Sequence, residues 1–245
     1  MIEIGSAIDP GRARRGKQNQ DALCVQYPPS PGAGPLLVIA DGMGGYQGGA
    51  LASQIVVECV CHAYSSTEPD AVPADVLRQG VDNALRSMKI AAAEDEALAY
   101  MGSTLVAAIA GEEHITLLNV GDSRAYLISA AAVRQISYDH SLVGEQLRRN
   151  LITQAEARTH PRRNVLSMSI SAKREQVDCF QGAFDWQPGD CLVLCSDGLW
   201  GPVNERQMRA VVLEYSSQEA ADRLVALANA NKGPDNIAVI VARLR

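Results

Sequence analysis

LLVIADGMGGYQGG, residues 36–49, is the stretch around which we expect the fold to form. Its first five residues are apolar, which is too short a run for a helix but suits a strand buried on both faces. Asp41 and a cluster of glycines follow at once, so an acid lies at the end of that strand. From residue 50 to residue 64 the polar side chains recur at a spacing of four, which predicts an amphipathic helix. The expected unit is therefore a strand, an acidic glycine-rich turn and a helix.

The pair Asp41-Gly42 alone permits two interpretations. It is ordinary turn chemistry, because Gly adopts positive φ and Asp bonds to its own backbone. Alternatively, the strand fixes the carboxylate while Gly42, which has no Cβ, lets its carbonyl oxygen approach an ion closely. A dinucleotide-binding fingerprint is excluded, since Gln47 stands where its third glycine is required.

The composition is that of an ordinary globular protein. At 245 residues, 47% hydrophobic and 20% charged, the chain suffices for one large domain or two small ones. No internal repeat, low-complexity linker or shift in composition marks a boundary, and we expect a single domain over residues 1–245. The net charge of −6 argues against a nucleic acid or an acidic membrane as the general partner. With only two Phe and two Trp, platforms for stacking bases are also not expected.

The cysteines indicate a compartment. None of the six forms a CxxC pair, and most lie in apolar runs, which is typical of reduced, buried thiols. A reducing cytoplasm is therefore the expected location. We see no charged-then-apolar leader and no apolar run near the roughly 18 residues of a membrane span, so no membrane segment is expected in this chain.

Further elements follow from the same patterns. Residues 104–128 predict three strands of an antiparallel meander, and Pro and Gly predict a loop at 28–35. Thr153 with Glu156, and Ser216 with Glu219, have the spacing of helix capping boxes. The expected strands are 2–8, 22–27, 36–40, 104–110, 115–120, 124–128, 191–195 and 237–244, and the expected helices are 50–64, 75–92, 142–149, one after residue 153, 205–214 and 218–230.

Four acids share one local pattern, in that each lies beside a glycine or a turn at the end of a strand: Asp41, Asp122, Asp197 and Asp235. Sheet-end loops that share one face commonly build active sites. If these carboxylates converge, two of them about 4 Å apart repel by several kcal/mol at an effective dielectric constant near 20, so a cation must neutralise them. Oxygen ligands without histidine or cysteine at metal-ligand spacing favour Mg²⁺ or Mn²⁺ over Zn²⁺. Two such ions would activate a water and hold a phosphoryl group for in-line attack, with a nearby Arg to anchor the phosphate.

Several motifs, in order, now identify a family. The chain resembles the metal-dependent Ser/Thr protein phosphatases, the protein phosphatase type 2C family, in its compact bacterial form. The resemblance covers nearly the whole chain and is carried by Asn19-Gln20-Asp21, Asp41-Gly42-Met43-Gly44-Gly45, Gly102-Ser103-Thr104, Val120-Gly121-Asp122-Ser123-Arg124, Asp139-His140-Ser141, Ser196-Asp197-Gly198-Leu199 and Asp235-Asn236.

The resemblance implies a fold and a cofactor. The fold is α+β, a four-layer α-β-β-α sandwich of two antiparallel sheets flanked by helix pairs. The cofactor is Mg²⁺ or Mn²⁺, with two ions at the core site and a third, weaker one. A mobile flap over about residues 141–175 is also implied, and this segment is basic. Its charges allow either a solvated surface or a docking surface for an anionic ligand.

The resemblance also implies roles for individual residues. Asp41 is similar to the carboxylate that bridges both ions, and Gly42 to a carbonyl ligand of one. Asp197 and Asp235 correspond to ligands of the other ion, and Asp122 with Asp197 to the pair that holds the third. Asp21 corresponds to a residue that orients metal-bound water from behind the ligands.

Three positions depart from the family pattern. The family has Arg three places before the Asn of the first motif, but Gly16 stands there, and we predict that Arg15 is the phosphate anchor. Met43 replaces a histidine that acts as a general acid in eukaryotic members. Residues 167–172, SMSISA, replace a stretch that is commonly basic and contains glycine.

The leading hypothesis is a phosphoprotein phosphatase that hydrolyses phosphoserine and phosphothreonine by direct attack of a metal-bridging water or hydroxide. Its partners would be phosphorylated proteins, the substrates of a Ser/Thr kinase. The alternatives are a catalytically silent phosphatase-like binding or sensor module, and a phosphoesterase for small molecules. No metal carboxylate is missing here, which argues against the silent module.

Overall fold

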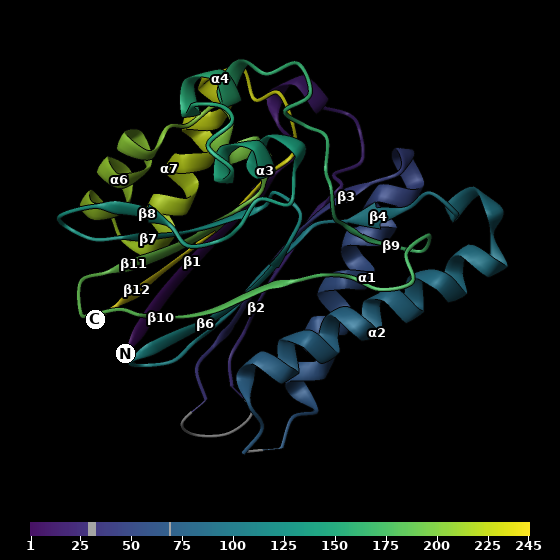
Figure 1. Ribbon diagram of the computed structural model, residues 1–245. Coiled ribbons are helices and arrows are strands. Elements are labelled where there is room, and N and C mark those ends of the chain that lie inside the picture. Colours follow the sequence, from purple (N-terminus) through teal and green to yellow (C-terminus); the bar gives the residue numbers. More distant parts are fainter. Residues whose placement is uncertain (29–32, 69) are drawn as a thin grey trace.

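The computed structural model describes residues 1–28, 33–68 and 70–245. Residues 29–32 of the predicted loop 28–35 lie outside this range. Two antiparallel sheets pack face to face, and helices cover their outer faces (Figure 1). The two chain ends lie side by side, with the Arg245 N–H donating to the Met1 carbonyl oxygen at 2.8 Å.

The first sheet has the strand order β1-β12-β11-β7-β8. The second has the order β10-β6-β5-β3-β4-β9, with β2 paired to β3. The strands are β1 (Ile2–Asp9), β2 (Asp21–Gln26), β3 (Leu36–Met43), β4 (Gly102–Ser103), β5 (Leu105–Ala110), β6 (His114–Val120), β7 (Arg124–Ile128), β8 (Val133–Gln135), β9 (Ile170–Ser171), β10 (Phe180–Asp185), β11 (Cys191–Cys195) and β12 (Ile237–Leu244).

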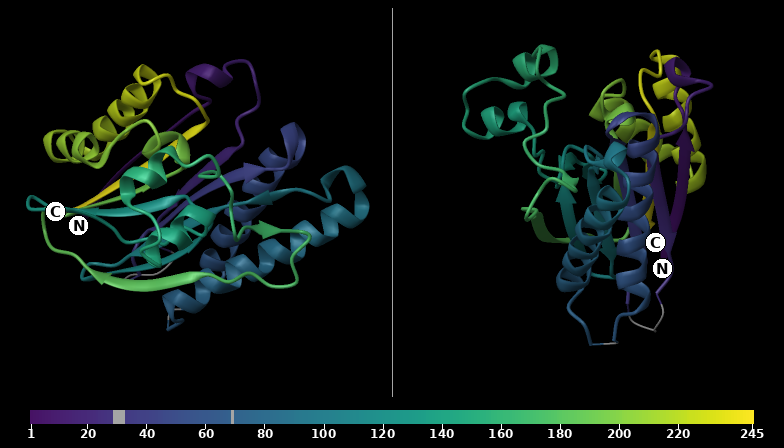
Figure 2. Two further views of the ribbon diagram at one scale, coloured as in Figure 1. Left: turned by 45° about the horizontal axis from the view of Figure 1, so that its top comes forward. Right: turned by 90° about the vertical axis from the view of Figure 1, so that its right-hand side faces the viewer.

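The helices form the two outer layers and a projecting segment. Helices α1 (Gly45–Ser65) and α2 (Pro73–Glu94) cover the second sheet, whereas α5 (Asp197–Trp200), α6 (Glu205–Glu214) and α7 (Ser217–Ala230) cover the first. Short helices α3 (Leu142–Arg148) and α4 (Gln154–Thr159) belong to a segment that stands away from the sandwich (Figure 2). Two 3-10 helices, η1 (Arg12–Arg14) and η2 (Glu96–Leu98), complete the described elements.

Three apolar cores hold the layers together. The central core lies between the sheets, where Leu37 and Ile39 of β3 face Leu194 of β11 and Ile240 of β12. Alternate residues of β3, Leu36 and Val38, point the other way and pack under α1 and α2. This is why β3 is apolar at every position up to Ala40, since both of its faces are buried. The predicted four-layer sandwich is confirmed.

Three local predictions were wrong. Strand β3 does not end at residue 40 but continues through Asp41 to Met43, because β4 pairs with its last two residues. The third strand of the predicted meander, β7, leaves the second sheet and joins β11 and β8 of the first. Ser216 caps α7 through the Glu219 N–H, but the Glu219 carboxylate binds Arg223 and does not close a capping box.

The crossing of β7 to the other sheet has a functional consequence. The crossing takes place in the turn after β6, at Gly121 and Asp122, and Gly121 adopts a φ of 91° there. If β7 had paired with β6 as predicted, Asp122 would lie in a turn within the second sheet. Because the chain changes sheets, Asp122 instead lies at the end of the sandwich between the two.

Candidate active site

The aspartates of the motifs gather at one end of the sandwich. In the second sheet Asp21 opens β2, and Asp41 is its direct partner on β3. In the first sheet Asp197 follows β11 and Asp235 precedes β12, and these two strands are neighbours. Asp122 precedes β7, which pairs with the other edge of β11. Strand register thus brings five acids, 214 positions apart at the extremes, to one place.

Two glycines allow the loops to pack closely. A Cβ on Gly42 would lie 1.9 Å from the Gly49 carbonyl oxygen at the start of α1. A Cβ on Gly198 would lie 1.8 Å from the carbonyl oxygen of Asn236. Both distances are far below a van der Waals contact, so only glycine fits at either place. Gly42 thereby lets the end of β3 pack against the start of α1, and Gly198 lets the turn that carries Asp197 pack against the one that carries Asp235.

Hydrogen bonds fix two of the acids. Asp21 Oδ2 accepts a bond from Ser196 Oγ at 2.6 Å, while its Oδ1 is buried without a hydrogen-bonding partner among the described residues. The Asp41 backbone N–H donates to Thr104 Oγ1 at 3.0 Å, and its carbonyl oxygen accepts from the Thr104 N–H at 2.8 Å. The Asp21 carboxylate is thus held by a side-chain bond, and the backbone of Asp41 is held to Thr104.

Burial, and then the charges of neighbouring acids, raise the pKa of four of these aspartates. Burial raises the pKa of Asp21 to about 8, and the negative charges of Asp197 and Asp235 add to it. Burial, with the charge of Asp197 next in size, raises the pKa of Asp122 to about 8. For Asp197 the pKa rises to about 6, through burial and then Asp235. Burial and the charge of Asp21 raise the pKa of Asp41 well above its ordinary value. So much unneutralised charge requires a cation.

The donor set fits a hard divalent ion. It consists of carboxylates and backbone carbonyl oxygens, and the Asp21 Oδ1 has no donor of its own. Within residues 1–28, 33–68 and 70–245, no three His, Cys, Asp or Glu side chains are already arranged as a complete metal site. Carboxylates that repel one another spread apart until an ion draws them in, so side-chain adjustment is expected on binding.

An arginine lies against this acidic cluster. Arg14, at the end of η1, donates from its guanidinium to Asp235 Oδ2 at 2.8 Å and to Gln20 Oε1 at 3.3 Å. Arg15, the residue predicted from the sequence, is exposed. The structure thus brings the neighbour of the predicted residue to the acids.

Three residues at this site were given no role by sequence reasoning, although two of them belong to the motifs. Ser196 binds Asp21, and the Asn236 side chain accepts a bond from the Gln20 N–H at 2.9 Å and donates to the Pro10 carbonyl oxygen at 2.8 Å. Ser196 and Asn236 both stand beside an acid of a motif, and that adjacency was the available signal. Trp200, which bonds to the Asp122 carbonyl oxygen, had no such signal.

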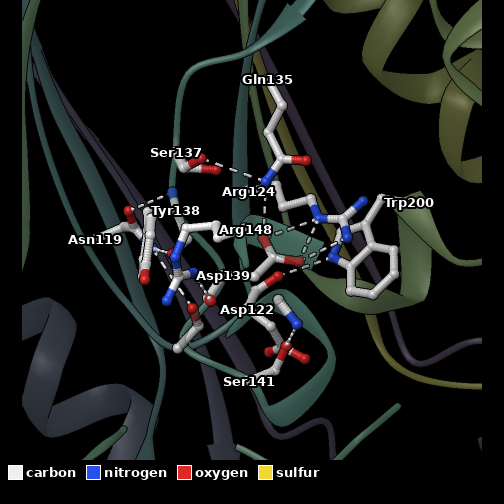
Figure 3. A network of polar contacts seen from close by, with 12 residues as sticks. Asn119, Asp122, Arg124, Gln135, Ser137, Tyr138, Asp139, Ser141, Arg148 and Trp200 are labelled. Atoms are coloured by element: carbon white, nitrogen blue, oxygen red, sulfur yellow. Dashed lines mark hydrogen bonds and ion pairs between the residues drawn. The ribbon is translucent and has the colours of Figure 1, made fainter. Parts of the chain in front are cut away.

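The projecting segment is attached next to Asp122. His140 Nδ1 accepts a bond from the Gly121 N–H at 3.2 Å, and the His140 backbone N–H donates to the Gly121 carbonyl oxygen at 2.8 Å. Figure 3 shows the polar network around Asp139, where Arg124, Gln135 and Arg148 converge. The base of the segment is therefore joined to the turn that carries Asp122.

Comparison with known proteins agrees with this geometry. The profile of the family described as protein phosphatase 2C matches residues 9–232. The chain belongs to the protein phosphatase 2C family. Among its relatives, the serine/threonine phosphatase stp of Listeria monocytogenes is 36% identical over 212 residues, which span 84% of this chain and 83% of the relative.

Two solved phosphatase 2C relatives extend the comparison to structure. The serine/threonine phosphatase Stp1 from Staphylococcus aureus superposes with a TM-score of 0.92 at 30% identity, covering 100% of this chain and 96% of its own. The catalytic domain of the phosphatase PstP, in complex with two manganese ions, has a TM-score of 0.85 at 29% identity and covers 99% of this chain and 97% of its own. The recognition of the family and of its fold is confirmed. Within the described residues, no helix combines the length and the hydrophobicity that a transmembrane span requires.

Proposed function

We propose that this chain is a Mg²⁺- or Mn²⁺-dependent phosphatase that hydrolyses phosphoserine and phosphothreonine in proteins. The observation that carries the proposal is the gathering of five aspartates at one end of the sandwich, with one arginine beside them; burial and the charges of their neighbours raise the pKa of Asp21, Asp41, Asp122 and Asp197. An acidic cluster alone would repel a phosphate. Together with divalent ions and Arg14, the cluster becomes a site for a phosphoryl group.

We assign the ligands from the resemblance of their motifs to those of the family. Asp41 would bridge two ions, the Gly42 carbonyl oxygen would hold one of them, and Asp197 with Asp235 would hold the other. Asp122 and Asp197 would hold a third, weaker ion. When bound, the ions neutralise these carboxylates, polarise the phosphoryl group and acidify water for attack on phosphorus.

The other residues act around the ions. Asp21 accepts a bond from Ser196 and keeps its second oxygen without a donor, so this oxygen is available to orient a water from behind the ligands. Arg14, whose side chain is 36% exposed, can donate hydrogen bonds from its planar guanidinium to two phosphate oxygens. We therefore assign the phosphate anchor to Arg14 rather than to Arg15.

Two features support phosphoproteins in the cytoplasm as substrates. The flap, residues 141–175, presents exposed arginines, among them Arg149, Arg162 and Arg163, on a segment that stands away from the sandwich (Figure 2) and is joined near its base to the turn that carries Asp122. A positively charged surface of this kind can bind the acidic surface of a phosphorylated protein. All six cysteines are free thiols, which suits the reducing cytoplasm in which Ser/Thr kinases act.

The test is metal-dependent hydrolysis of a phosphothreonine peptide and of an aryl phosphate. We expect turnover that requires Mn²⁺ or Mg²⁺ and stops with a chelator. Asp41→Asn and Asp235→Asn should each lower kcat by at least about 100-fold, because each removes an oxygen ligand. Asp75→Asn, an exposed carboxylate in the first turn of α2, is the matched control and should keep full activity. Undiminished turnover in both site variants would refute the proposal.

A comparison of substrates tests the class. We expect phosphopeptides to be hydrolysed with a higher kcat/KM than nucleotides or sugar phosphates. Preference for a small phosphoester would overturn the assignment to proteins while leaving the metal chemistry intact. Phosphopeptide binding without turnover would indicate a silent binding module.

A further inference from the structure

Trp200 joins two parts of the site that are far apart in sequence. It is the last residue of α5, the short helix that begins with Asp197. Its indole Nε1–H donates to the Asp122 carbonyl oxygen at 3.0 Å, across 78 positions of the chain. One side chain thus connects the backbone that carries Asp122 to the helix that carries Asp197.

Arg124 holds the indole in place. Its guanidinium carbon lies over the Trp200 ring, 3.6 Å from the ring centre, so the cation stacks on the indole. The guanidinium does not swing freely, because it donates to both carboxylate oxygens of Asp139 at 2.7 to 3.1 Å and to the Tyr126 hydroxyl at 3.0 Å. The side chains of Arg124 and Asp139 are only 19% and 11% exposed, so solvent screens this ion pair weakly.

Asp139 connects the same network to the flap. It immediately precedes His140, which exchanges two hydrogen bonds with Gly121, the residue before Asp122. Its carbonyl oxygen accepts a bond from Arg148 on α3, and the Arg148 guanidinium lies 3.3 Å from the centre of the Tyr138 ring. Figure 3 shows these side chains as one continuous set between Trp200 and the flap.

We propose that Trp200 is a positioning residue for the third ion. Its hydrogen bond sets the separation of Asp122 and Asp197, and the Arg124–Asp139 pair transmits the position of the flap base to that separation. The inference rests on the proposed function, since it presumes that Asp122 and Asp197 bind an ion together. Trp200 contacts neither substrate nor ion itself, and it acts through the Asp122 backbone.

The experiment is a calorimetric titration of native protein and of Trp200→Phe with Mn²⁺, which measures the affinity of each ion site. Phenylalanine keeps an aromatic ring under Arg124 but cannot donate to Asp122. We expect the weakest Mn²⁺ site to lose about three- to tenfold in affinity, the effect of one neutral hydrogen bond, while the two tighter sites stay within about twofold. A change that is equal at all sites, or absent from all, would overturn the proposal.

The only other tryptophan supplies a matched control. Trp186 donates from Nε1 to the Gly111 carbonyl oxygen, also at 3.0 Å, and it is buried. Trp186→Phe removes the same kind of bond at a residue outside the metal site, so all Mn²⁺ affinities should stay native. If Trp186→Phe and Trp200→Phe weaken the third site equally, the effect is general loosening and the proposal fails.

Two more variants keep the test decisive. If Trp200→Phe does not fold, Asp139→Asn takes its place, because it weakens the pair that holds Arg124 without changing the side-chain shape, and the same selective loss is expected. Asp122→Asn should abolish the weakest site. Should Asp122→Asn bind as many ions as native protein, this inference is wrong while the proposed function stands. Turnover of native protein without any divalent ion would instead overturn the proposed function.

Discussion

Arg14 and Asp235 are 221 positions apart in the chain, and they form an ion pair with a distance of 2.8 Å between guanidinium nitrogen and carboxylate oxygen. The other Asp235 oxygen accepts the Asn236 N–H at 2.7 Å. The loops themselves are also joined, since the Ala13 N–H donates to the Gly233 carbonyl oxygen at 2.9 Å. Roughly a third of each side chain remains exposed, which leaves the guanidinium accessible from the open side of the site.

The first prediction concerns the phosphate anchor. Arg14→Ala should lower kcat/KM for a phosphothreonine peptide by about 10- to 100-fold, because a charge-assisted pair with phosphate contributes about 1.5–3 kcal/mol. Arg15→Ala is the matched control, one position away, exposed and of equal charge, and it should stay within about twofold. Steady-state kinetics with both variants decide the matter, and the reverse order of effects would make Arg15 the anchor.

This pair also shows where sequence reasoning stops. The motifs place several positive charges near Asn19, but Arg14 and Arg15 lie at the end of a 3-10 turn. Arg14 is the last residue of that 3-10 helix, whereas Arg15 follows it with extended backbone angles, so the two neighbouring side chains take different directions. Sequence reasoning had no signal for that turn, and Arg14 is the residue that contacts Asp235.

The convergence of the acids, by contrast, could be predicted. Each acid follows or precedes an apolar strand, and antiparallel pairing brings strand ends such as Asp21 and Asp41 together. What could not be predicted was the crossing of β7 into the other sheet, because its alternation pattern suits either partner. The hydrogen bond from Trp200 to Asp122 could not be predicted either, because it depends on how two turns that are distant in sequence pack together.

The second prediction concerns Gly42. Gly42→Ala should lower the free energy of unfolding by at least about 2 kcal/mol, because its Cβ would lie 1.9 Å from the Gly49 carbonyl oxygen and α1 would have to move. Gly48→Ala is the control, since its Cβ would meet Met101 at an ordinary 3.4 Å and alanine favours the helix. Thermal unfolding should show a lower Tm for the first variant and an unchanged or higher Tm for the second. Equal Tm values would contradict the close packing of the two loops.

The third prediction concerns Ser196. Its hydroxyl donates to Asp21 Oδ2 at 2.6 Å and accepts the Ala238 N–H at 3.0 Å, so Ser196→Ala leaves two buried groups without a partner. We expect a loss of about 2–3 kcal/mol in the free energy of unfolding. Ser53→Ala, equally buried but bonded only to the Ala50 carbonyl oxygen within α1, should cost less than about 1 kcal/mol. Urea unfolding of both variants gives the comparison, and equal losses would show that the Asp21 contact adds nothing.

The last prediction is a dependence of metal-free stability on pH. Folding raises the pKa of Asp21 and Asp122 from 3.8 to about 8, and that of Asp197 to about 6, with burial as the largest cause in each case. Between the unfolded pKa of 3.8 and the folded pKa of each group, the folded chain binds more protons than the unfolded chain, so the free energy of unfolding falls as the pH rises. The contribution of each group is complete below about pH 4 and is lost by the time the pH passes its folded pKa.

The measurement is Tm in the presence of a chelator between about pH 5 and pH 8, where each carboxyl adds a slope of at most about 1.4 kcal/mol per pH unit. Asp122→Asn removes one titrating group and should flatten this slope, which assigns that part of the pH dependence to Asp122. Saturating Mn²⁺ should raise Tm most at the alkaline end, because the ions bind the deprotonated carboxylates. A metal-free Tm that rises with pH in native protein and is unaffected by Asp122→Asn would mean that these acids do not share one buried site.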